Sequence, residues 1–265
     1  MSKISVYIIT YNEEEQITEA INSVLWADEI VVVDSGSTDH TCQVAEQLGV
    51  RVERVVFHGF GELRNQALTF CQYEWIFNLD ADERCTEAVR NEILNLINDQ
   101  DSQDIYYVPR KNFFMGRWIR YSGWYPNYRQ PQLFRNKSLL YNLDLVHEGF
   151  IAQSDKIGYL KQPIWQITFK NFEEMVYKAN RYSSLGAEKL QRNGKTATLG
   201  KALGHGLWAF IKHYIFKLGF LEGWAGFIIA LGNFEGTFYR YAKLWERQQQ
   251  WQLPKQKPVK KPNKS

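Results

Sequence analysis

The sequence predicts an α/β protein with a mostly parallel, Rossmann-like sheet flanked by helices, followed by a helical extension. Over the first hundred residues, short apolar runs of strand type alternate with helical stretches of about ten residues. This alternation is typical of right-handed βαβ units and therefore of a parallel sheet. Beyond residue 100 the pattern becomes short and aromatic-rich, and from residue 171 it becomes helical.

The first strand is expected at residues 3–10, which are apolar at most positions. Asn12, with Glu15 three residues later, resembles a capping box, so a helix should follow directly. Residues 29–34 are predicted as a second strand because Val and Ile run continuously, as in a sheet buried on both faces. The next helix should end at Gly49, because glycine readily takes the left-handed conformation that closes a helix.

The remaining elements of the sheet follow the same alternation. A third strand is expected at residues 50–56, and a glycine-rich turn then opens a helix around residues 63–71. Residues 74–79 form the fourth predicted strand, and a helix should follow at about residues 86–98. Residues 105–150 are predicted to be strands and loops that complete one wall of a cleft.

The C-terminal third is predicted to be helical, amphipathic at residues 171–193 and strongly aromatic at residues 199–247. Its longest uncharged piece near the end, residues 223–234, is too short for the roughly 20 residues of a membrane span. The charged or polar side chains Lys201, His205 and Lys212 fall on one helical face. Two readings stay open: helices lying in the membrane interface, or an ordinary helical subdomain or oligomer contact.

The chain has 265 residues, of which 45% are apolar, enough for a sizeable core and for one or two domains. Its net charge of +3 is unevenly placed. Residues 252–265 hold five Lys and no acid, which leaves 27 basic against 29 acidic residues in residues 1–251. The basicity therefore belongs to a tail that should be disordered. It does not indicate a nucleic-acid-binding fold, but it supports contact with anionic lipid headgroups.

Cysteine usage favours a reducing compartment, because the three cysteines show no metal-binding or redox spacing. No signal peptide is visible, since the first strand begins by Ile4. The expected organisation has three parts: a catalytic α/β domain at residues 1–165, a helical region at residues 166–251, and the basic tail at residues 252–265.

The fourth predicted strand ends in two carboxylates, Asp80 and Asp82, spaced one residue apart. Alternate side chains of a strand point the same way, so the pair should aim at one point beyond the strand end. In open α/β sheets, ligands bind at that edge. Two converging carboxylates repel each other unless a cation lies between them, and Mg²⁺ or Mn²⁺ with a substrate phosphate as co-ligand suits oxygen ligation. The alternative is a solvated acidic turn.

Three other polar segments lie at expected loop or helix-start positions: Thr10-Tyr11-Asn12-Glu13-Glu14, Asp34-Ser35-Gly36-Ser37-Thr38-Asp39 and Arg64-Asn65-Gln66-Ala67-Leu68. Together with Asp80-Ala81-Asp82-Glu83 they resemble the family 2 glycosyltransferases, which have the GT-A fold of nucleotide-sugar enzymes. The resemblance is dense over roughly residues 3–150. It is greatest to the bacterial branch that includes the lipopolysaccharide-core β-glucosyltransferases.

The resemblance implies a role for each matching position. Thr10, Tyr11 and Glu13 would line the uracil pocket, and Asp34 would hydrogen-bond the base or ribose. The remaining matching positions are Arg64 near the nucleotide, Asp80 at the ribose or the metal shell, and Asp82 as a metal ligand. Two alternatives remain, because Asp34 would also suit a turn or helix cap and Arg64 a surface ion pair.

Inverting transfer also needs a general base that deprotonates the acceptor hydroxyl. Glu148 in Leu-Val-His-Glu-Gly matches the family's His-Glu element, with Asp144 as runner-up. His147 would touch the metal or the diphosphate, or merely orient its neighbour. Arg110 and Arg135 are expected to face phosphate or acceptor.

The resemblance thus implies an inverting, metal-dependent glycosyltransferase that moves a sugar, with glucose expected, from a UDP-sugar. The aromatic C-terminal third and the basic tail, rather than the catalytic motifs, favour a membrane-associated glycan or glycolipid as the acceptor. The enzyme would work in the cytoplasm, peripherally on the inner face of the cytoplasmic membrane. The chain lacks the Gln-x-x-Arg-Trp element and the transmembrane helices of processive members, so polymer export is not expected. The alternatives are a polyprenyl-phosphate sugar synthase and a non-catalytic nucleotide-sugar-binding protein. The sequence leaves the donor sugar, the acceptor, the choice of Mg²⁺ or Mn²⁺ and the oligomeric state open.

Overall fold

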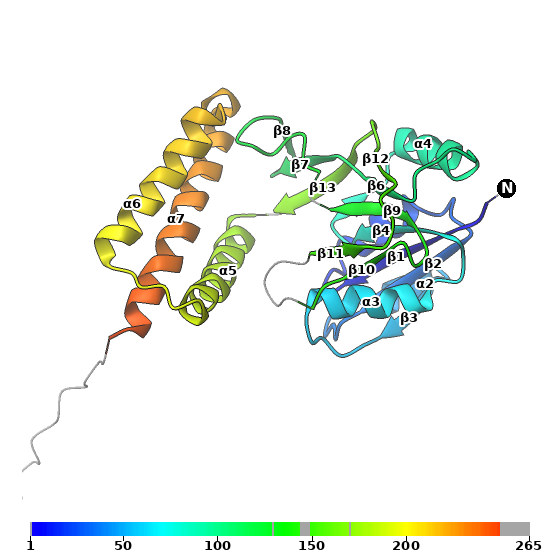
Figure 1. Ribbon diagram of the computed structural model, residues 1–265, viewed down its shortest axis with the longest axis horizontal. Helices are drawn as coiled ribbons and strands as arrows, with labels where there is room; N and C mark the ends of the chain where they lie inside the picture. The colour runs from blue at the N-terminus through cyan, green and yellow to red at the C-terminus, as the bar shows by residue number, and fades with distance from the viewer. Residues whose placement is uncertain (1, 129, 144–148, 170, 250–265) are drawn as a thin grey trace, which may run out of the picture.

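The computed structural model describes residues 2–128, 130–143, 149–169 and 171–249. Its main sheet has seven strands in the order β12-β6-β9-β4-β1-β2-β3. They are β1 (Ile4–Thr10), β2 (Glu29–Asp34), β3 (Arg51–Arg54), β4 (Trp75–Asp80), β6 (Ile105–Tyr107), β9 (Pro131–Arg135) and β12 (Ile157–Tyr159). β1 pairs in parallel with β2 and β4, and β2 with β3, while β9 runs antiparallel to β4 and β6. The mainly parallel sheet is therefore confirmed (Figure 1).

Helices cover both faces of this sheet because its strands are apolar on both sides. Ile4, Val6 and Ile8 of β1 pack against α1 (Ile17–Asn22), α2 (Thr41–Gln47) and α4 (Glu87–Ile97). Tyr7 and Ile9 point the other way, toward α3 (Phe60–Phe70) and β10 (Leu139–Tyr141). This alternation is the period of two of a strand buried on both faces. The result is a three-layer α/β/α core.

A second sheet continues from the main one and has the order β5-β13-β7-β8. Its strands are β5 (Glu83–Arg84), β13 (Ile164–Phe169), β7 (Arg110–Phe114) and β8 (Arg117–Ile119). β13 is antiparallel to β5 and parallel to β7. The domain boundary expected at residue 165 falls inside β13, so the catalytic sheet extends to the end of that strand. A small pair, β10 with β11 (Phe150–Ala152), completes the strands.

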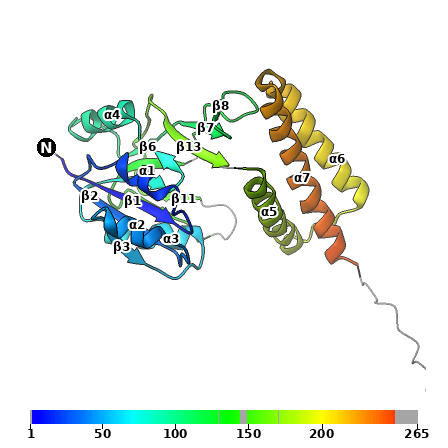
Figure 2. The same cartoon turned by 180° about the vertical axis from the view of Figure 1, so that it is seen from behind.

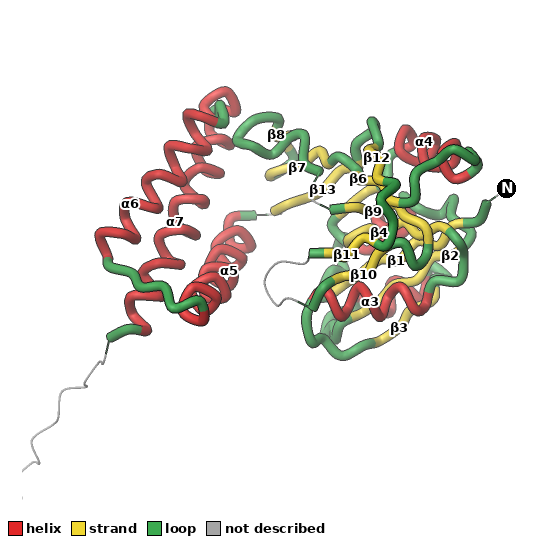
Figure 3. Tube along the Cα trace, viewed as in Figure 1, coloured by secondary structure: helices red, strands yellow, loops and turns green. Residues whose placement is uncertain are grey.

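The helical region consists of α5 (Phe172–Arg192) and a hairpin of α6 (Leu199–Ile211) and α7 (Trp224–Arg247) (Figures 1 and 3). A π-helical turn, Lys212–Phe216, and a 3₁₀ turn, Gly219–Glu222, connect α6 to α7. The chain therefore changes direction between Lys212 and Gly223. Gly226 permits the close return of the chain, because a Cβ atom there would lie 1.7 Å from the carbonyl oxygen of Gly219.

The hairpin is anchored on the second sheet, as Figure 2 shows. The Glu222 carboxylate accepts hydrogen bonds from the backbone N–H groups of Arg120 and Tyr121, both at 2.8 Å. An apolar cluster joins Phe114 of β7 to Met175 of α5 and Ile229 of α7. The helical region thus packs on the second sheet, to one side of the α/β/α core. Within the described residues, no helix is long and apolar enough to span a bilayer.

Several local expectations need correction. The capping box is wrong: α1 begins only at Ile17, and the Asn12 side chain instead accepts a hydrogen bond from the N–H of Thr38 at 2.8 Å. Asn12 has φ +55°, so it closes a tight turn that joins two loops. The third strand ends at Arg54, and α3 begins at Phe60, earlier than expected. The basic tail at residues 252–265 lies outside the described residues.

Candidate active site

Three polar segments meet at the carboxyl-terminal edge of the main sheet. The strand register places Thr10 beside Asp34 across β1 and β2, and Ile9 beside Asp80 across β1 and β4. Neighbouring strands lie about 4.8 Å apart, so the loops that follow them share one edge. The structure therefore brings the loops that follow β1, β2 and β4 to one edge of the sheet. This edge is where open α/β sheets bind ligands.

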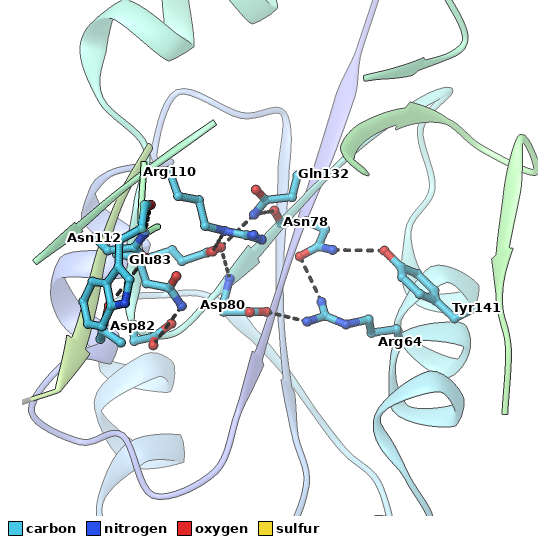
Figure 4. A network of polar contacts seen from close by, with 12 residues as sticks. Arg64, Asn78, Asp80, Asp82, Glu83, Arg110, Asn112, Gln132 and Tyr141 are labelled. Atoms are coloured by element: carbon cyan, nitrogen blue, oxygen red, sulfur yellow. Dashed lines mark hydrogen bonds and ion pairs between the residues drawn. The ribbon is translucent and has the colours of Figure 1, made fainter. Parts of the chain in front are cut away.

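Asp80 is held by a buried network that includes Arg64 of α3 (Figure 4). Arg64 is only 3% exposed, and its Nη2 lies 2.9 Å from Asp80 Oδ1. Its Nη1 donates to Asn78 Oδ1 at 3.0 Å, and Asn78 Nδ2 donates to the Tyr141 hydroxyl at 3.0 Å. The alternative of a surface ion pair for Arg64 is therefore wrong. In this structure Arg64 acts on the edge of the sheet by fixing the orientation of Asp80.

Glu83 secures the turn that follows β4, although its side chain is fully buried. Its carboxylate accepts hydrogen bonds from the Asp80 N–H at 3.0 Å, from Gln132 Nε2 at 2.7 Å and from Arg110 Nε at 2.5 Å. Burial raises the pKa of Glu83, and the Arg110 charge acts in the opposite direction. Arg110 was expected to face phosphate or acceptor. The structure instead places it inside the protein, where it pairs with Glu83.

Asp82 lies in the turn between β4 and β5, not on the strand. β4 ends at Asp80, so the alternation that was expected to aim the two carboxylates together does not reach Asp82. Figure 4 shows the Asp80 carboxylate directed at Arg64. Asp82 Oδ2 instead accepts from Nε2 of Gln166 on β13 at 3.3 Å, and its carbonyl accepts from the N–H of Ile167.

The Asp82 carboxyl lies in surroundings that disfavour a negative charge. Burial, followed by the charges of Asp80 and Glu83, raises the pKa of Asp82 to about 7. A carboxyl shifted in this way becomes easier to ionise when a cation comes close. Asp82 therefore carries a negative charge less readily than an exposed carboxyl group, and a nearby cation would lower its pKa.

The described residues do not form a closed metal site. Among them, no three His, Cys, Asp or Glu side chains converge to hold an ion. Asp82, with Asp80 nearby, would leave most coordination positions to other ligands. Mg²⁺ and Mn²⁺ commonly bind through one or two carboxylates plus substrate phosphates. The donor set therefore fits a hard divalent ion that arrives with a phosphorylated substrate.

The residues expected around a nucleotide differ in accessibility. Tyr11 is 53% exposed, whereas Asp34 is 2% exposed. The Asp34 carboxylate accepts from the backbone N–H groups of Gly36 and Ser37, both at 3.0 Å, and from the Ser37 hydroxyl. Asp34 thus caps its own turn, which was the alternative role expected for this residue.

Thr10 and Glu13 lie on the same edge, on either side of Tyr11. Within the described part of the chain, the buried Thr10 hydroxyl finds no hydrogen-bond partner. Its backbone carbonyl accepts from the N–H of Ser35 at 3.1 Å. The Glu13 N–H donates to the Thr41 hydroxyl at 2.8 Å, which ties the first loop to α2. Thr10 therefore lies at this edge with its side chain buried and its hydroxyl unsatisfied among the described residues.

Arg135 lies far from this edge, contrary to expectation. β9 runs antiparallel to β4 and pairs Arg135 with Trp75, at the start of β4. Asp80 lies five positions beyond Trp75, a distance of about 16 Å along a strand. The Arg135 guanidinium lies 4.4 Å from the Trp75 ring centre and pairs with Asp104 and Glu74. Its role is to stabilise the opposite end of the sheet.

Asp144, His147 and Glu148 lie outside the described residues. The chain on either side of them is held by Asn142 and Gly149. The Asn142 N–H donates to the Gly149 carbonyl at 2.9 Å, and the Gly149 N–H donates to the Asn142 side-chain oxygen at 2.9 Å. Asn142 directly follows Tyr141, whose hydroxyl belongs to the Arg64 network. The described residues on the two sides of this segment, Asn142 and Gly149, are therefore hydrogen-bonded to each other next to Tyr141.

Sequence reasoning missed five residues of this site: Asn78, Glu83, Gln132, Tyr141 and Gln166. Glu83 was visible beside the acidic pair, and it is the first residue of the two-residue strand β5. Gln132, Tyr141 and Gln166 come from β9, β10 and β13. Those strands reach the site through non-local pairing, which the sequence pattern does not reveal.

The chain is similar to known proteins over most of its length. The family model described as Glycosyl transferase family 2 matches residues 5–158. An uncharacterized glycosyltransferase of Rickettsia felis is 32% identical, covering 93% of this chain and 90% of that protein. The lipopolysaccharide core biosynthesis glycosyltransferase LpsC of Rhizobium meliloti is 29% identical, covering 92% of each. A crystal structure of S. aureus TarS is similar with a TM-score of 0.49 and 19% identity, covering 94% of this chain and 92% of that one.

Proposed function

This chain belongs to glycosyltransferase family 2, and we propose that it transfers a sugar with inversion from a UDP-sugar to a membrane-associated glycan or glycolipid, with the help of a divalent metal ion. That it is a glycosyltransferase follows from the family model and the relatives. The metal part of the proposal is supported chiefly by one observation: Asp80 ends β4 and Asp82 follows it, at the edge where open α/β sheets bind ligands. Glucose is the sugar that we expect.

The donor would lie along the edge formed by β1 and β2. The exposed Tyr11 ring is available there for a base, and Thr10 would line the pocket partly through its backbone. Glu13 would line the same pocket, partly through its backbone. Asp34 would hydrogen-bond the base or ribose while it caps its turn. Asp80, held by Arg64, would contact the ribose or the metal shell.

Asp82 would hold Mg²⁺ or Mn²⁺, with Asp80 and His147 as possible additional ligands. When bound, such an ion would supply positive charge for the departing diphosphate. Gln166 orients the Asp82 carboxylate, and Glu83 fixes the turn on which it lies. A half-buried, oriented carboxylate needs little rearrangement when the ion arrives, which favours binding.

Glu148 is proposed as the general base, with Asp144 as runner-up. The acceptor hydroxyl oxygen would attack the anomeric carbon while the bond to the diphosphate breaks, and the hydroxyl proton would pass to the carboxylate. Attack from the face opposite the leaving group inverts the anomeric centre. A phosphate acceptor, as in a polyprenyl-phosphate sugar synthase, needs no strong base. Glu148→Gln should therefore abolish transfer to a hydroxyl but barely slow transfer to a phosphate.

A membrane-associated acceptor is supported by the surface of α6 and by a relative. Five apolar side chains recur at every fourth position and are exposed: Leu199, Leu203, Leu207, Ile211 and Ile215. Lys201 and Lys212 fall on another face of the helix, and the lysine-rich tail would add attraction to anionic lipid. LpsC, by its name, acts in lipopolysaccharide core biosynthesis. We therefore propose a peripheral position on the inner face of the cytoplasmic membrane and an acceptor of the glycolipid class.

A thermal-shift series tests the donor assignment. Wild-type protein is heated with Mn²⁺ and, in turn, UDP-glucose, UDP-galactose, UDP-N-acetylglucosamine and GDP-mannose. A donor that binds only the folded state raises the Tm by mass action. UDP-glucose should give the largest rise and GDP-mannose none. Equal rises for the uridine and guanosine compounds would refute the uracil pocket, and tight binding without any transfer would favour a non-catalytic binding protein.

A further inference from the structure

A cavity of about 460 Å³ lies between the second sheet and the helical region. Its walls come from β7, β13, α5 and α7, together with the loop that follows β8. The residues that matter for its chemistry are Asn112, Trp124, Gln166, Lys178, Tyr182 and Arg240. The cavity therefore exists only because the helical hairpin packs on the α/β core.

The cavity begins at the acidic turn. Gln166, which lines it, donates to Asp82 Oδ2 at 3.3 Å. The edge proposed for the donor runs over β1 and β2, whereas the cavity opens beyond β5, along β13. Asp82 lies in the turn between β4 and β5, and so between these two regions. A second substrate in the cavity would meet the donor at Asp82.

The lining of the cavity is suited to an anionic sugar. Among the described residues that line it, Lys178 and Arg240 carry positive charge and none carries a carboxylate. Amide side chains and the rings of Trp124 and Tyr182 make up much of the remaining wall. Convergent amides bind hydroxyl groups, apolar ring faces cover the C–H faces of a sugar, and Arg or Lys binds phosphate or carboxylate.

Both cations are positioned by their surroundings. Lys178 Nζ lies 2.7 Å from Glu174 and 3.3 Å from the Thr168 carbonyl, so it is held against β13. Arg240 crosses α5 at Gly186, where a Cβ atom would approach its Nε to 2.8 Å. A larger residue at position 186 would therefore collide with the Arg240 side chain. The two charges thus face the cavity from two different helices.

We propose that this cavity is the acceptor subsite, and that the acceptor carries a negative charge next to the sugar that is glycosylated, held by Lys178 and Arg240. The inference rests on the proposed function, because it names the substrate class of the same transfer. The charge is a phosphate monoester or a sugar carboxylate, since both offer oxygens that a guanidinium and an ammonium recognise.

Binding of small anionic sugars tests the proposal. Ligand-observed NMR titrations in the presence of UDP and Mn²⁺ would measure the affinity for glucose 6-phosphate, glucuronic acid and glucose. The wild type should bind at least one of the two anionic sugars more tightly than glucose, and the tighter of the two identifies the anion. Lys178→Gln and Arg240→Gln should each weaken that binding about tenfold, the loss expected for one charge-assisted hydrogen bond.

Arg181→Gln is the matched control, because Arg181 lies on the same helix as Lys178 but outside the cavity lining. It loses the same charge and should keep wild-type affinity. The inference is overturned if UDP binds but the anionic sugars bind no better than glucose, if none of the three sugars binds, or if all three variants behave alike. Absence of UDP binding to the wild type would instead refute the proposed function itself.

Discussion

Asp80 owes its position to groups that come from several elements of the fold. Arg64 of α3 and Asn78 of β4 fix its side chain, while Glu83 binds its backbone N–H. Tyr141 of β10 completes the network through Asn78. Sequence patterns located Asp80 and Arg64 and placed both near the nucleotide. They did not reveal that Arg64 is buried and bound to Asp80, because that contact depends on how α3 packs on the sheet.

Arg64→Met should destabilise the fold and misplace Asp80. Removing one partner of a buried ion pair leaves the other charge uncompensated, at a cost of about 3 kcal/mol. Partial exposure of Asp80 puts the loss at the lower end of the usual range. Denaturant unfolding measures it. Arg54→Met is the control, because Arg54 and Glu46 form an exposed pair whose loss should leave stability nearly unchanged. Equal effects of the two substitutions would contradict the buried network.

Burial also controls the thiols of Cys71 and Cys85, whose pKa values it raises to about 12. Their folded pKa values exceed the ordinary value of 9.0, so the folded state holds its thiol protons longer than the unfolded state. Stability should therefore fall as the pH rises from 9.0 toward 12, because ionisation favours unfolding there. Iodoacetamide at about pH 8 should modify both residues only after unfolding. Rapid modification of native Cys71 or Cys85 would contradict their burial.

At the scale of elements, the first four strands and the helices between them were predictable, because each has a local pattern. Val and Ile in β2 and the continuous apolar residues of β1 mark strands buried on both faces. The second sheet was not predictable. β5 has only two residues, and β13 pairs with it from about eighty residues away along the chain. The position of Arg135 was wrong for the same reason, since the direction of β9 depends on a non-local pairing.

The hairpin of α6 and α7 depends on close packing at Gly226. An alanine there would drive its Cβ atom into the Gly219 carbonyl, so Gly226→Ala should cost about 1–3 kcal/mol. Gly204→Ala in α6 is the matched control, because nothing lies within 4 Å of its Cβ position. That change should stabilise the helix by up to about 1 kcal/mol. Thermal unfolding of the two variants distinguishes them, and a neutral Gly226→Ala would refute the packing.

At the scale of the whole molecule, the apolar stripe of α6 gives the protein one face suited to a lipid surface. Leu203→Ser combined with Leu207→Ser should weaken binding to vesicles of anionic phospholipid. Each CH₂ group that no longer enters the membrane removes about 0.8 kcal/mol of binding free energy. Co-sedimentation measures the binding, and rising salt should weaken the wild type further. Leu140→Ser is the control, since Leu140 is also exposed but lies on β10. Equal vesicle binding by all variants would refute the contact between α6 and lipid.

In the proposed mechanism, a divalent ion bound by Asp82 would hold the diphosphate of the donor at the edge of the main sheet. Calorimetric titration of UDP into wild-type protein, once with Mn²⁺ and once with EDTA, tests this most directly. We predict binding that weakens at least about tenfold without the ion, and an Asp82→Asn variant whose weak binding no longer responds to Mn²⁺. Asp101→Asn, an exposed substitution after α4, should behave as wild type. UDP binding of equal strength in Mn²⁺ and in EDTA would contradict the account.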